Sequence, residues 1–93
     1  MPHKVFHSKV FERKVVLVTG GCAGIGRALV MRFAQAGARL VILDLQQSEL
    51  DFLVQHLRDQ FNAEALGLVC DVADAAAVNQ AMAQVSERFG GID

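Results

Sequence analysis

The sequence predicts a three-layer α/β protein, in which a parallel sheet of three strands carries helices on both faces. Three short runs of branched apolar residues alternate with three segments whose apolar residues recur at helical spacing. The runs are continuously apolar, which is typical of parallel strands that are covered on both faces. Right-handed crossovers between neighbouring parallel strands then predict the strand order 3-2-1.

A glycine-rich turn follows the first predicted strand, Val15–Thr19. Four glycines stand close together after that strand: Gly20, Gly21, Gly24 and Gly26. Glycine adopts backbone angles that are closed to other residues, and its missing Cβ lets a bulky partner approach the main chain. The turn therefore predicts a place where the backbone itself contacts a ligand.

The first predicted helix begins at Gly24, runs to about Ala36 and ends at Gly37. Its apolar residues recur at helical spacing, at Ala28, Leu29 and Phe33. The free amide groups and the positive end of the helix dipole face the glycine-rich turn. A phosphate group is the natural ligand of such a helix N-terminus.

The second apolar run, Leu40–Leu43, ends at Asp44, which is about twenty residues after the glycine-rich turn. In a dinucleotide-binding fold, a carboxylate at this place accepts hydrogen bonds from the adenosine ribose and repels a 2′-phosphate. An alternative role for Asp44 is to end the strand or to cap the next helix.

The third predicted strand, Ala65–Cys70, is interrupted by Gly67 and is followed by Asp71 and Val72. This places a second carboxylate at the end of a strand. Because the carboxyl ends of parallel strands lie at one edge of the sheet, both acidic residues are expected beside the glycine-rich turn.

The second and third helices are predicted from their ends and their apolar faces. Ser48 is expected to start the second helix, and Asn62 to end it in a left-handed conformation. Asp74 is expected to cap the third helix, which ends at Gly90 and Gly91. The apolar faces consist of Leu50, Leu53, Val54, Leu57 and Phe61 in the second helix and Val78, Ala81, Met82, Val85 and Phe89 in the third.

The composition argues against several classes of protein. Nine basic and ten acidic residues give a net charge of −1, which does not suit a nucleic-acid groove or an anionic membrane surface. No apolar run approaches the length of a membrane span. Cys22 and Cys70 have no metal-ligand or C-x-x-C spacing, so a reducing cytoplasm is favoured over a secreted disulfide scaffold.

Residues 1–12 are interpreted as an N-terminal tail, and residues 13–93 as the domain. The tail is basic but lacks the apolar core of a signal peptide. His3 and His7 could share a helix face, yet no acidic or thiol partner stands nearby. No metal site is therefore predicted.

The segment Thr19-Gly20-x-x-x-Gly24-Ile25-Gly26, placed after an apolar strand, resembles the motif of the short-chain dehydrogenase/reductase superfamily. Its spacing differs from the G-x-G-x-x-G dinucleotide fingerprint. The resemblance extends from about Phe11 to Asp93 and covers only the N-terminal portion of a family member, up to the start of the fourth strand. It implies a Rossmann-like, truncated doubly wound fold, in which the third helix crosses to the other face of the sheet.

The resemblance also implies an NAD site. NAD is expected to be preferred over NADP, because Asp44 would repel the 2′-phosphate and Ala23, Leu45 and Gln46 offer no basic side chain to compensate. In the family, the residue matching Asp71 binds the adenine amino group, and the residue matching Val72 adds a backbone contact. The implied cofactor-binding residues are Gly20, Cys22, Ala23, Gly24, Ile25, Gly26, Asp44, Leu45, Asp71 and Val72.

Family members transfer a hydride between the nicotinamide cofactor and a carbonyl or alcohol substrate, using a tyrosine, a lysine four residues after it, a serine and an asparagine. This sequence contains no tyrosine, and neither Ser48 nor Ser86 matches the context of the family's serine. The chain alone is therefore expected to be inactive. A further departure is Arg13, where many members have a glycine.

Two other interpretations remain for the chain itself. It can be a non-catalytic, truncated remnant that binds nucleotide weakly or serves as an assembly module. Because the first strand would then form an unprotected edge, self-association through that strand or through the third helix is expected.

Two rival classes fit the glycine-rich turn less well. A phosphate-loop nucleotidase needs a lysine and a hydroxyl residue where this chain has Arg27 and Ala28. A methyltransferase that uses S-adenosylmethionine would be expected to carry an acid just before the glycines, where Val18 and Thr19 stand.

Overall fold

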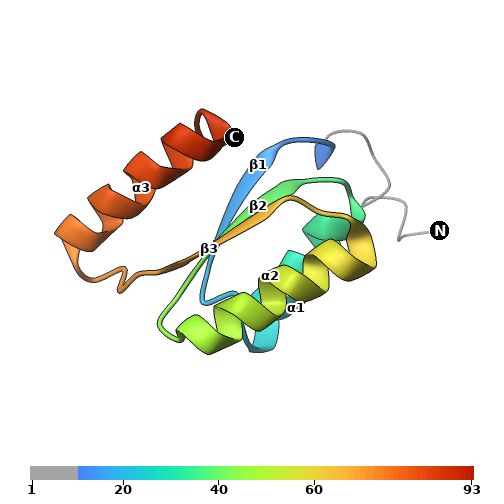
Figure 1. Cartoon of the computed structure of the whole chain (residues 1–93), viewed down its shortest axis with the longest axis horizontal. Helices are drawn as coiled ribbons and strands as arrows, with labels where there is room; N and C mark the ends of the chain where they lie inside the picture. Colours follow the sequence, from blue (N-terminus) through green and yellow to red (C-terminus); the bar gives the residue numbers. More distant parts are fainter. Residues whose placement is uncertain (1–10) are drawn as a thin grey trace.

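The computed structural model describes residues 11–93, which form three successive strand–helix units (Figure 1). Residues 1–10 of the predicted tail, which include His3 and His7, therefore lie outside the described residues. The strands are β1 (Val15–Thr19), β2 (Arg39–Asp44) and β3 (Ala65–Val69), and the helices are α1 (Gly24–Gln35), α2 (Gln47–Phe61) and α3 (Ala75–Phe89).

The strands form one parallel sheet in the order β1-β2-β3, with β2 in the centre. The pairing of β1 with β2 runs from Val15 opposite Arg39 to Thr19 opposite Leu43. The last pair between β2 and β3 joins Asp44 and Val69. All three strands thus end at the same edge of the sheet, and the predicted parallel α/β architecture is confirmed.

Helices cover both faces of the sheet (Figure 1). One core lies between the sheet and the layer of α1 and α2, where Leu50, Leu53 and Leu57 of α2 are at most 1% exposed. The other lies between the sheet and α3, which contributes the buried residues Ala81 and Val85. The third helix therefore crosses to the opposite face, as the resemblance implied.

Three helix ends differ in how well the sequence predicted them. Asp74 caps α3 by accepting hydrogen bonds from the amides of Ala76 and Ala77, and Asn62 ends α2 with a left-handed φ of 53°. The prediction that Ser48 starts α2 is wrong, because the helix begins at Gln47. Gln46 is its N-cap residue and makes no side-chain cap, so the usual side-chain signal is missing.

Two packing expectations also need correction. Gly67 does not interrupt β3 but pairs with Ile42. A Cβ at Gly67 would lie 3.1 Å from Cγ2 of Val54, so the glycine lets α2 approach the sheet closely. The predicted apolar face of α1 is wrong at Ala28 and Leu29, which are exposed, whereas Val30 and Ala34 are buried. The helix also ends at Gln35, one residue before the predicted end.

Candidate functional site

An open cavity of about 300 Å³ lies at the carboxyl ends of the strands. Its lining consists of Thr19, Gly20, Leu43, Asp44, Leu45, Cys70, Asp71 and Val72. Parallel α/β proteins bind ligands at this edge, because the loops after successive strands converge there. The structure thus brings five predicted residues, from three separate loops, around one cavity.

The glycine-rich turn beside the cavity needs its glycines for two physical reasons. Gly20 and Gly24 have positive φ values of 65° and 58°, which side-chain-bearing residues rarely adopt. At Gly26 the reason is contact, since a Cβ there would overlap the carbonyl oxygen of Gly20. The start of α1 can therefore pack directly against the backbone of the turn.

The N-terminus of α1 faces this turn without a cap from its own sequence. Ala23, the N-cap residue, is extended and makes no side-chain hydrogen bond, and the first turn of the helix contains no acidic residue. Helix N-termini leave amide groups unsatisfied and carry a partial positive charge. The arrangement suits an anionic ligand such as a phosphate.

Asp44 connects the end of β2 to the glycine-rich turn. Its Oδ1 accepts a hydrogen bond from the amide of Leu45 at 2.7 Å, and its Oδ2 accepts one from the amide of Cys22 at 3.0 Å. These two bonds, with that of Leu45 the stronger, hold the pKa of Asp44 below its usual range. Asp44 does not cap α2, since the N-cap residue is Gln46.

Cys22 is a buried, protonated thiol in the same turn. Burial is the main cause that raises its pKa to about 11, followed by the hydrogen bond with Asp44 and the negative charge of that residue. Cys22 is 8% exposed, which agrees with a space-filling role rather than with a reactive thiolate. The positive charge of Arg27, at the start of α1, acts on the pKa of this thiol in the opposite direction.

Asp71 lies after β3 on the other side of the cavity. It is exposed, and its Oδ1 accepts a hydrogen bond from the amide of Ala73 at 3.0 Å. The neighbouring Val72 is 56% exposed, and Leu45, after β2, is 62% exposed. Exposed apolar side chains beside a charged group are typical of a surface that receives a partly apolar ligand.

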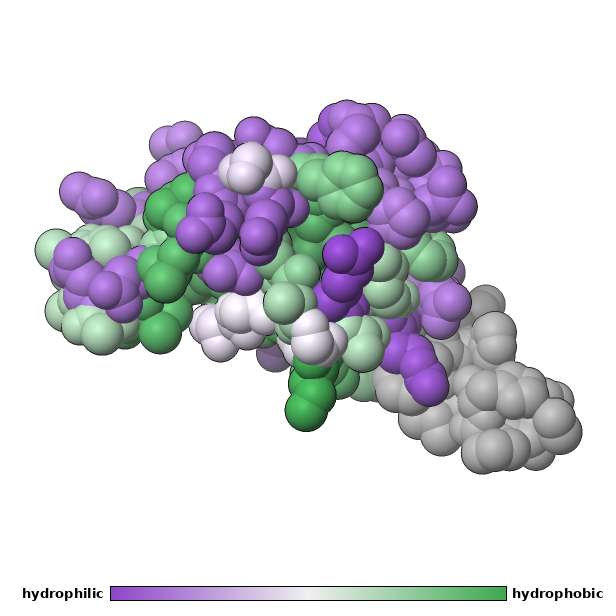
Figure 2. All heavy atoms as spheres, turned by 90° about the horizontal axis from the view of Figure 1, so that it is seen from below, coloured by the Kyte–Doolittle hydropathy of each residue, from purple (hydrophilic) through white to green (hydrophobic). Residues whose placement is uncertain are grey.

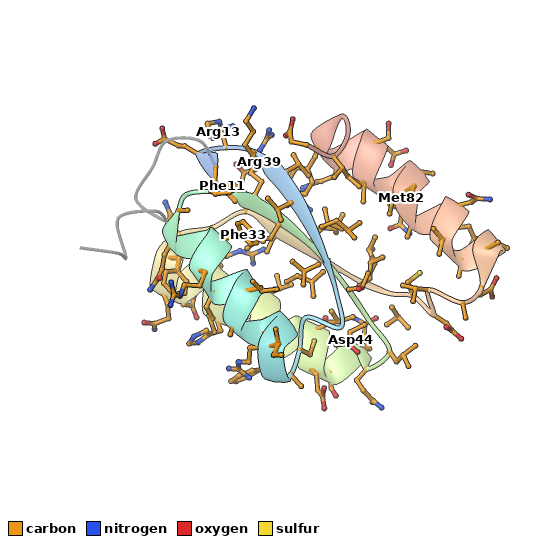
Figure 3. The ribbon with its side chains drawn as sticks, turned by 180° about the vertical axis from the view of Figure 1, so that it is seen from behind. Phe11, Arg13, Phe33, Arg39, Asp44 and Met82 are labelled. Carbon is orange, nitrogen blue, oxygen red and sulfur yellow. The ribbon has the colours of Figure 1, made fainter. Side chains whose placement is uncertain are left out.

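The figures place this region at one end of the molecule. Figure 3 shows Asp44 at the end of β2 that lies beside the start of α1, far from Arg13 and Arg39 at the other end of the sheet. Figure 2 shows hydrophobic surface toward the end where the loops after β2 and β3 lie in Figure 1. Smaller hydrophobic patches also lie near the middle and at the lower edge of that view, between hydrophilic areas.

The predicted residues fall into two groups. Gly20, Asp44, Leu45, Asp71 and Val72 line the cavity, whereas Cys22, Ala23, Gly24, Ile25 and Gly26 belong to the turn and helix start beside it. Thr19, Leu43 and Cys70 also line the cavity but were not among the predicted cofactor-binding residues. Their position in the sequence could have indicated them, because each directly precedes a predicted site residue at the end of a strand.

Among residues 11–93, no three histidine, cysteine, aspartate or glutamate side chains gather in a way that could hold a metal ion. Within the same range, no helix has the length and apolar character needed to cross a membrane.

A parallel sheet with helices on both faces, and a glycine-rich turn that meets an acidic residue at its carboxyl edge, defines a Rossmann-type α/β protein. The family model for short chain dehydrogenases matches residues 14–93. The chain therefore belongs to the short-chain dehydrogenase family, and the resemblance seen in its glycine motif is confirmed.

Individual relatives agree with this assignment. The chain is 43% identical over 79 residues to a 2,5-dichloro-2,5-cyclohexadiene-1,4-diol dehydrogenase from Sphingobium indicum, a match that covers 85% of this chain and 31% of the relative. The structure of L-sorbose reductase from Gluconobacter frateurii, complexed with NADPH and L-sorbose, matches with a TM-score of 0.88 and 32% identity over 91% of this chain and 32% of that one. A short chain dehydrogenase/reductase from Burkholderia phymatum, in complex with NAD, matches with a TM-score of 0.83 and 34% identity over 88% of this chain and 29% of that one.

The chain thus spans about a third of the length of these relatives. One of the two structural relatives binds NADPH and the other binds NAD. These relatives thus include both forms of the nicotinamide dinucleotide.

Proposed function

We propose that this chain is the NAD-binding N-terminal part of a short-chain dehydrogenase/reductase that transfers a hydride between a nicotinamide cofactor and a carbonyl or alcohol substrate. The observation that carries this proposal is the junction of the glycine-rich turn with Asp44, whose Oδ2 lies 3.0 Å from the amide nitrogen of Cys22. The junction supports the proposal, because the uncapped start of α1 suits a phosphate and a carboxylate at this edge can accept hydrogen bonds from a ribose.

Each part of the site has a role in the proposal. The turn and the start of α1, formed by Gly20, Cys22, Ala23, Gly24, Ile25 and Gly26, bind the diphosphate, and the close contact of Gly26 with Gly20 supports this role. Asp44 and Leu45 hold the adenosine ribose. Asp71 and Val72 hold the adenine, which the exposed apolar surface of Val72 supports.

The preference for NAD over NADP rests on charge. The backbone hydrogen bonds to Asp44 favour its ionised form, and an ionised carboxylate opposes a 2′-phosphate at the ribose. Arg27 is the competing influence, because its positive charge reaches Cys22 in the same turn. We propose that Asp44 prevails, since its carboxylate lines the cavity, whereas Arg27 is not among the lining residues.

Calorimetric titration with NAD and NADP tests the preference. Asp44 would contribute charge-assisted hydrogen bonds, each of about 1.5 to 3 kcal/mol, so NAD should bind at least about tenfold more tightly than NADP. Asp44→Ala should abolish the preference, whereas Asp51→Ala, on the exposed surface of α2, should retain it. Tighter binding of NADP, or an unchanged preference in Asp44→Ala, would contradict the proposal.

By itself, the 93-residue chain is proposed to bind nucleotide without catalysing hydride transfer. General acid–base catalysis contributes about 10²- to 10⁴-fold to such rates, and the sequence has no tyrosine to supply it. The alternative is a truncated remnant that acts only as a weak nucleotide-binding or assembly module. Turnover followed by NADH absorbance, in a preparation free of other dehydrogenases, would contradict both statements.

The outer edge of β1 supports a role in assembly. Val15 pairs there with Asp93, whose amide donates to the Val15 carbonyl at 2.9 Å and whose Oδ2 accepts from the Val15 amide at 2.7 Å. The alternation along the strand also directs the amide and carbonyl of Leu17 away from β2. We propose that the chain self-associates through this edge or through α3. We also propose a cytoplasmic location, which the two unpaired cysteines support.

A further inference from the structure

Two hydrogen bonds fasten the glycine-rich turn to the end of β2. The amide of Gly20 donates to the carbonyl of Leu43 at 2.8 Å, which continues the backbone pairing of the sheet. The amide of Cys22 donates to Oδ2 of Asp44 at 3.0 Å. The second bond differs in kind, because it depends on a side chain and therefore on the residue at position 44.

The middle of the turn has a physical need for this second bond. Cys22 is only 8% exposed, so an amide without its partner would lose a hydrogen bond with little water to replace it. The flanking glycines, Gly20 and Gly24, both have positive φ values, and glycine leaves the backbone more freedom than other residues do. A fixed point between them restricts the shape of the turn.

The acceptor capacity of Asp44 allows it to fasten the turn and bind a ligand together. An ionised carboxylate has about four lone-pair sites on its two oxygens. Leu45 occupies one site on Oδ1, the amide of Cys22 occupies one on Oδ2, and the Cys22 thiol takes a third. One site therefore remains, so a ribose hydroxyl can bind without breaking either backbone contact. An asparagine can hold only one of the two backbone amides, because its carbonyl oxygen accepts but its amide nitrogen donates; an alanine can hold neither.

We propose that Asp44 is a positioning residue for the glycine-rich turn, in addition to its proposed role as the ribose acceptor. Its carboxylate holds the Cys22 amide, and through it the turn, in the shape that receives the diphosphate. Substitution of Asp44 therefore weakens binding even of ligands that have no ribose hydroxyls. The identity of the ligand in this proposal rests on the proposed function. The contact between Asp44 and the Cys22 amide does not, because the unliganded chain already makes it.

The first test measures amide hydrogen exchange in the unliganded 93-residue chain by NMR. Asp44→Ala, which leaves no acceptor at position 44, should speed exchange of the Cys22 amide about tenfold, the effect of losing one hydrogen bond of about 1.4 kcal/mol. The matched control is Asp51→Ala, at an exposed residue of α2 that contacts Gln47. It should leave the Cys22 amide unchanged, and the core amide of Leu57 should be unchanged in both variants. Equal exchange of Cys22 in wild type and Asp44→Ala would overturn the proposal.

The second test compares adenosine diphosphate with its 2′,3′-dideoxy analogue, which lacks both ribose hydroxyls. If Asp44 only recognises those hydroxyls, wild type and Asp44→Ala bind the dideoxy analogue equally, and the positioning role is wrong. If Asp44 holds the turn, Asp44→Ala binds the analogue about tenfold more weakly. Failure of wild type to bind either diphosphate would contradict the proposed function instead, and the exchange of Cys22 would then decide the positioning role alone.

Discussion

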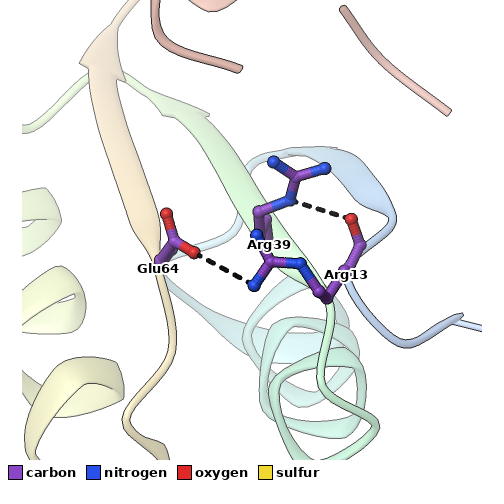
Figure 4. A network of polar contacts seen from close by, with 3 residues as sticks. All are labelled: Arg13, Arg39 and Glu64. Carbon is purple, nitrogen blue, oxygen red and sulfur yellow. Dashed lines mark hydrogen bonds and ion pairs between the residues drawn. The ribbon is translucent and has the colours of Figure 1, made fainter. Parts of the chain in front are cut away.

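Arg13, just before β1, has a left-handed backbone with a φ of 61°. It stands where many family members have a glycine, which adopts this conformation without strain. The amide of Arg13 donates to the Gly37 carbonyl at 2.8 Å, and its carbonyl accepts from Nε of Arg39 at 2.8 Å (Figure 4). These backbone contacts fix the turn and do not need the Arg13 side chain.

Arg13→Gly should therefore stabilise the chain by about 1 kcal/mol, because it removes the cost of a left-handed non-glycine residue. The side chain that is lost forms only an exposed ion pair with Glu64 at 3.7 Å, which is worth little. Urea unfolding measures the change. Arg13→Ala is the control: it also loses the ion pair but keeps the unfavourable φ, so it should give no gain. Equal stability of the two variants would show that the turn is not strained.

The Cys22 thiol gives stability a dependence on alkaline pH. Burial, and then Asp44, raise its pKa to about 11, above the ordinary cysteine value of about 8.5. The protonated thiol is thus favoured in the folded state, so its contribution is fully present below the ordinary value and is lost as the pH rises toward the higher one. Wild type should lose more stability than Cys22→Ala between neutral pH and pH about 10. Urea unfolding under reducing conditions measures this, and parallel pH profiles would exclude it.

At the scale of elements, the strands were the most predictable features. Continuous apolar runs predicted β1 as Val15–Thr19 and located β2 and β3 to within one residue at each end. The start of α2 was missed because Gln46 and Gln47 carry no capping signal. The role of Gly67 was missed as well, because the close approach of Val54 is a tertiary contact that a local pattern does not contain.

In the candidate site, too, residue positions were predictable from the sequence, whereas tertiary contacts were not. Asp44 and Asp71 were found from their positions after apolar runs, and both line the cavity. The hydrogen bond between Asp44 and the Cys22 amide was not predictable, because it joins residues 22 positions apart through a rotamer choice. The influence of Arg27 on Cys22 was missed for the same reason, since it depends on where the first turn of α1 points.

The junction between the glycine-rich turn and α1 should tolerate no added side chain. Gly26→Ala places a methyl group against the Gly20 carbonyl oxygen, which the hydrogen bond of Gly20 to Leu43 holds in place. We expect destabilisation of about 1 to 3 kcal/mol and loss of NAD binding. Thermal unfolding and calorimetry measure both. Gly67→Ala is the control, since its new methyl group would meet side-chain atoms of Val54 at 3.1 Å and of Leu50 at 3.3 Å rather than the glycine-rich turn, and NAD binding should persist. Full binding by Gly26→Ala would contradict this geometry.

For the whole molecule, the outer edge of β1 predicts association of the 93-residue chain. Beyond the pairing of Val15 with Asp93, the outward backbone groups of Leu17 can pair with a second copy. Sedimentation over a dilution series should show a dimer that dissociates on dilution. Leu17→Pro removes the outward amide and should weaken a dimer formed through this edge, but not one formed through α3. A compact monomer at all concentrations would contradict both routes.

The most direct test of the central claim, that NAD binds at the carboxyl edge of the sheet, is an NMR titration of the ¹⁵N-labelled chain with NAD. The amide signals of the glycine-rich turn, of Leu45 and of Val72 should shift together and saturate with one binding constant. Those of Arg39 and Glu64, at the opposite end of the sheet, should remain in place. Shifts confined to that opposite end, or no shifts at any NAD concentration, would contradict this binding site.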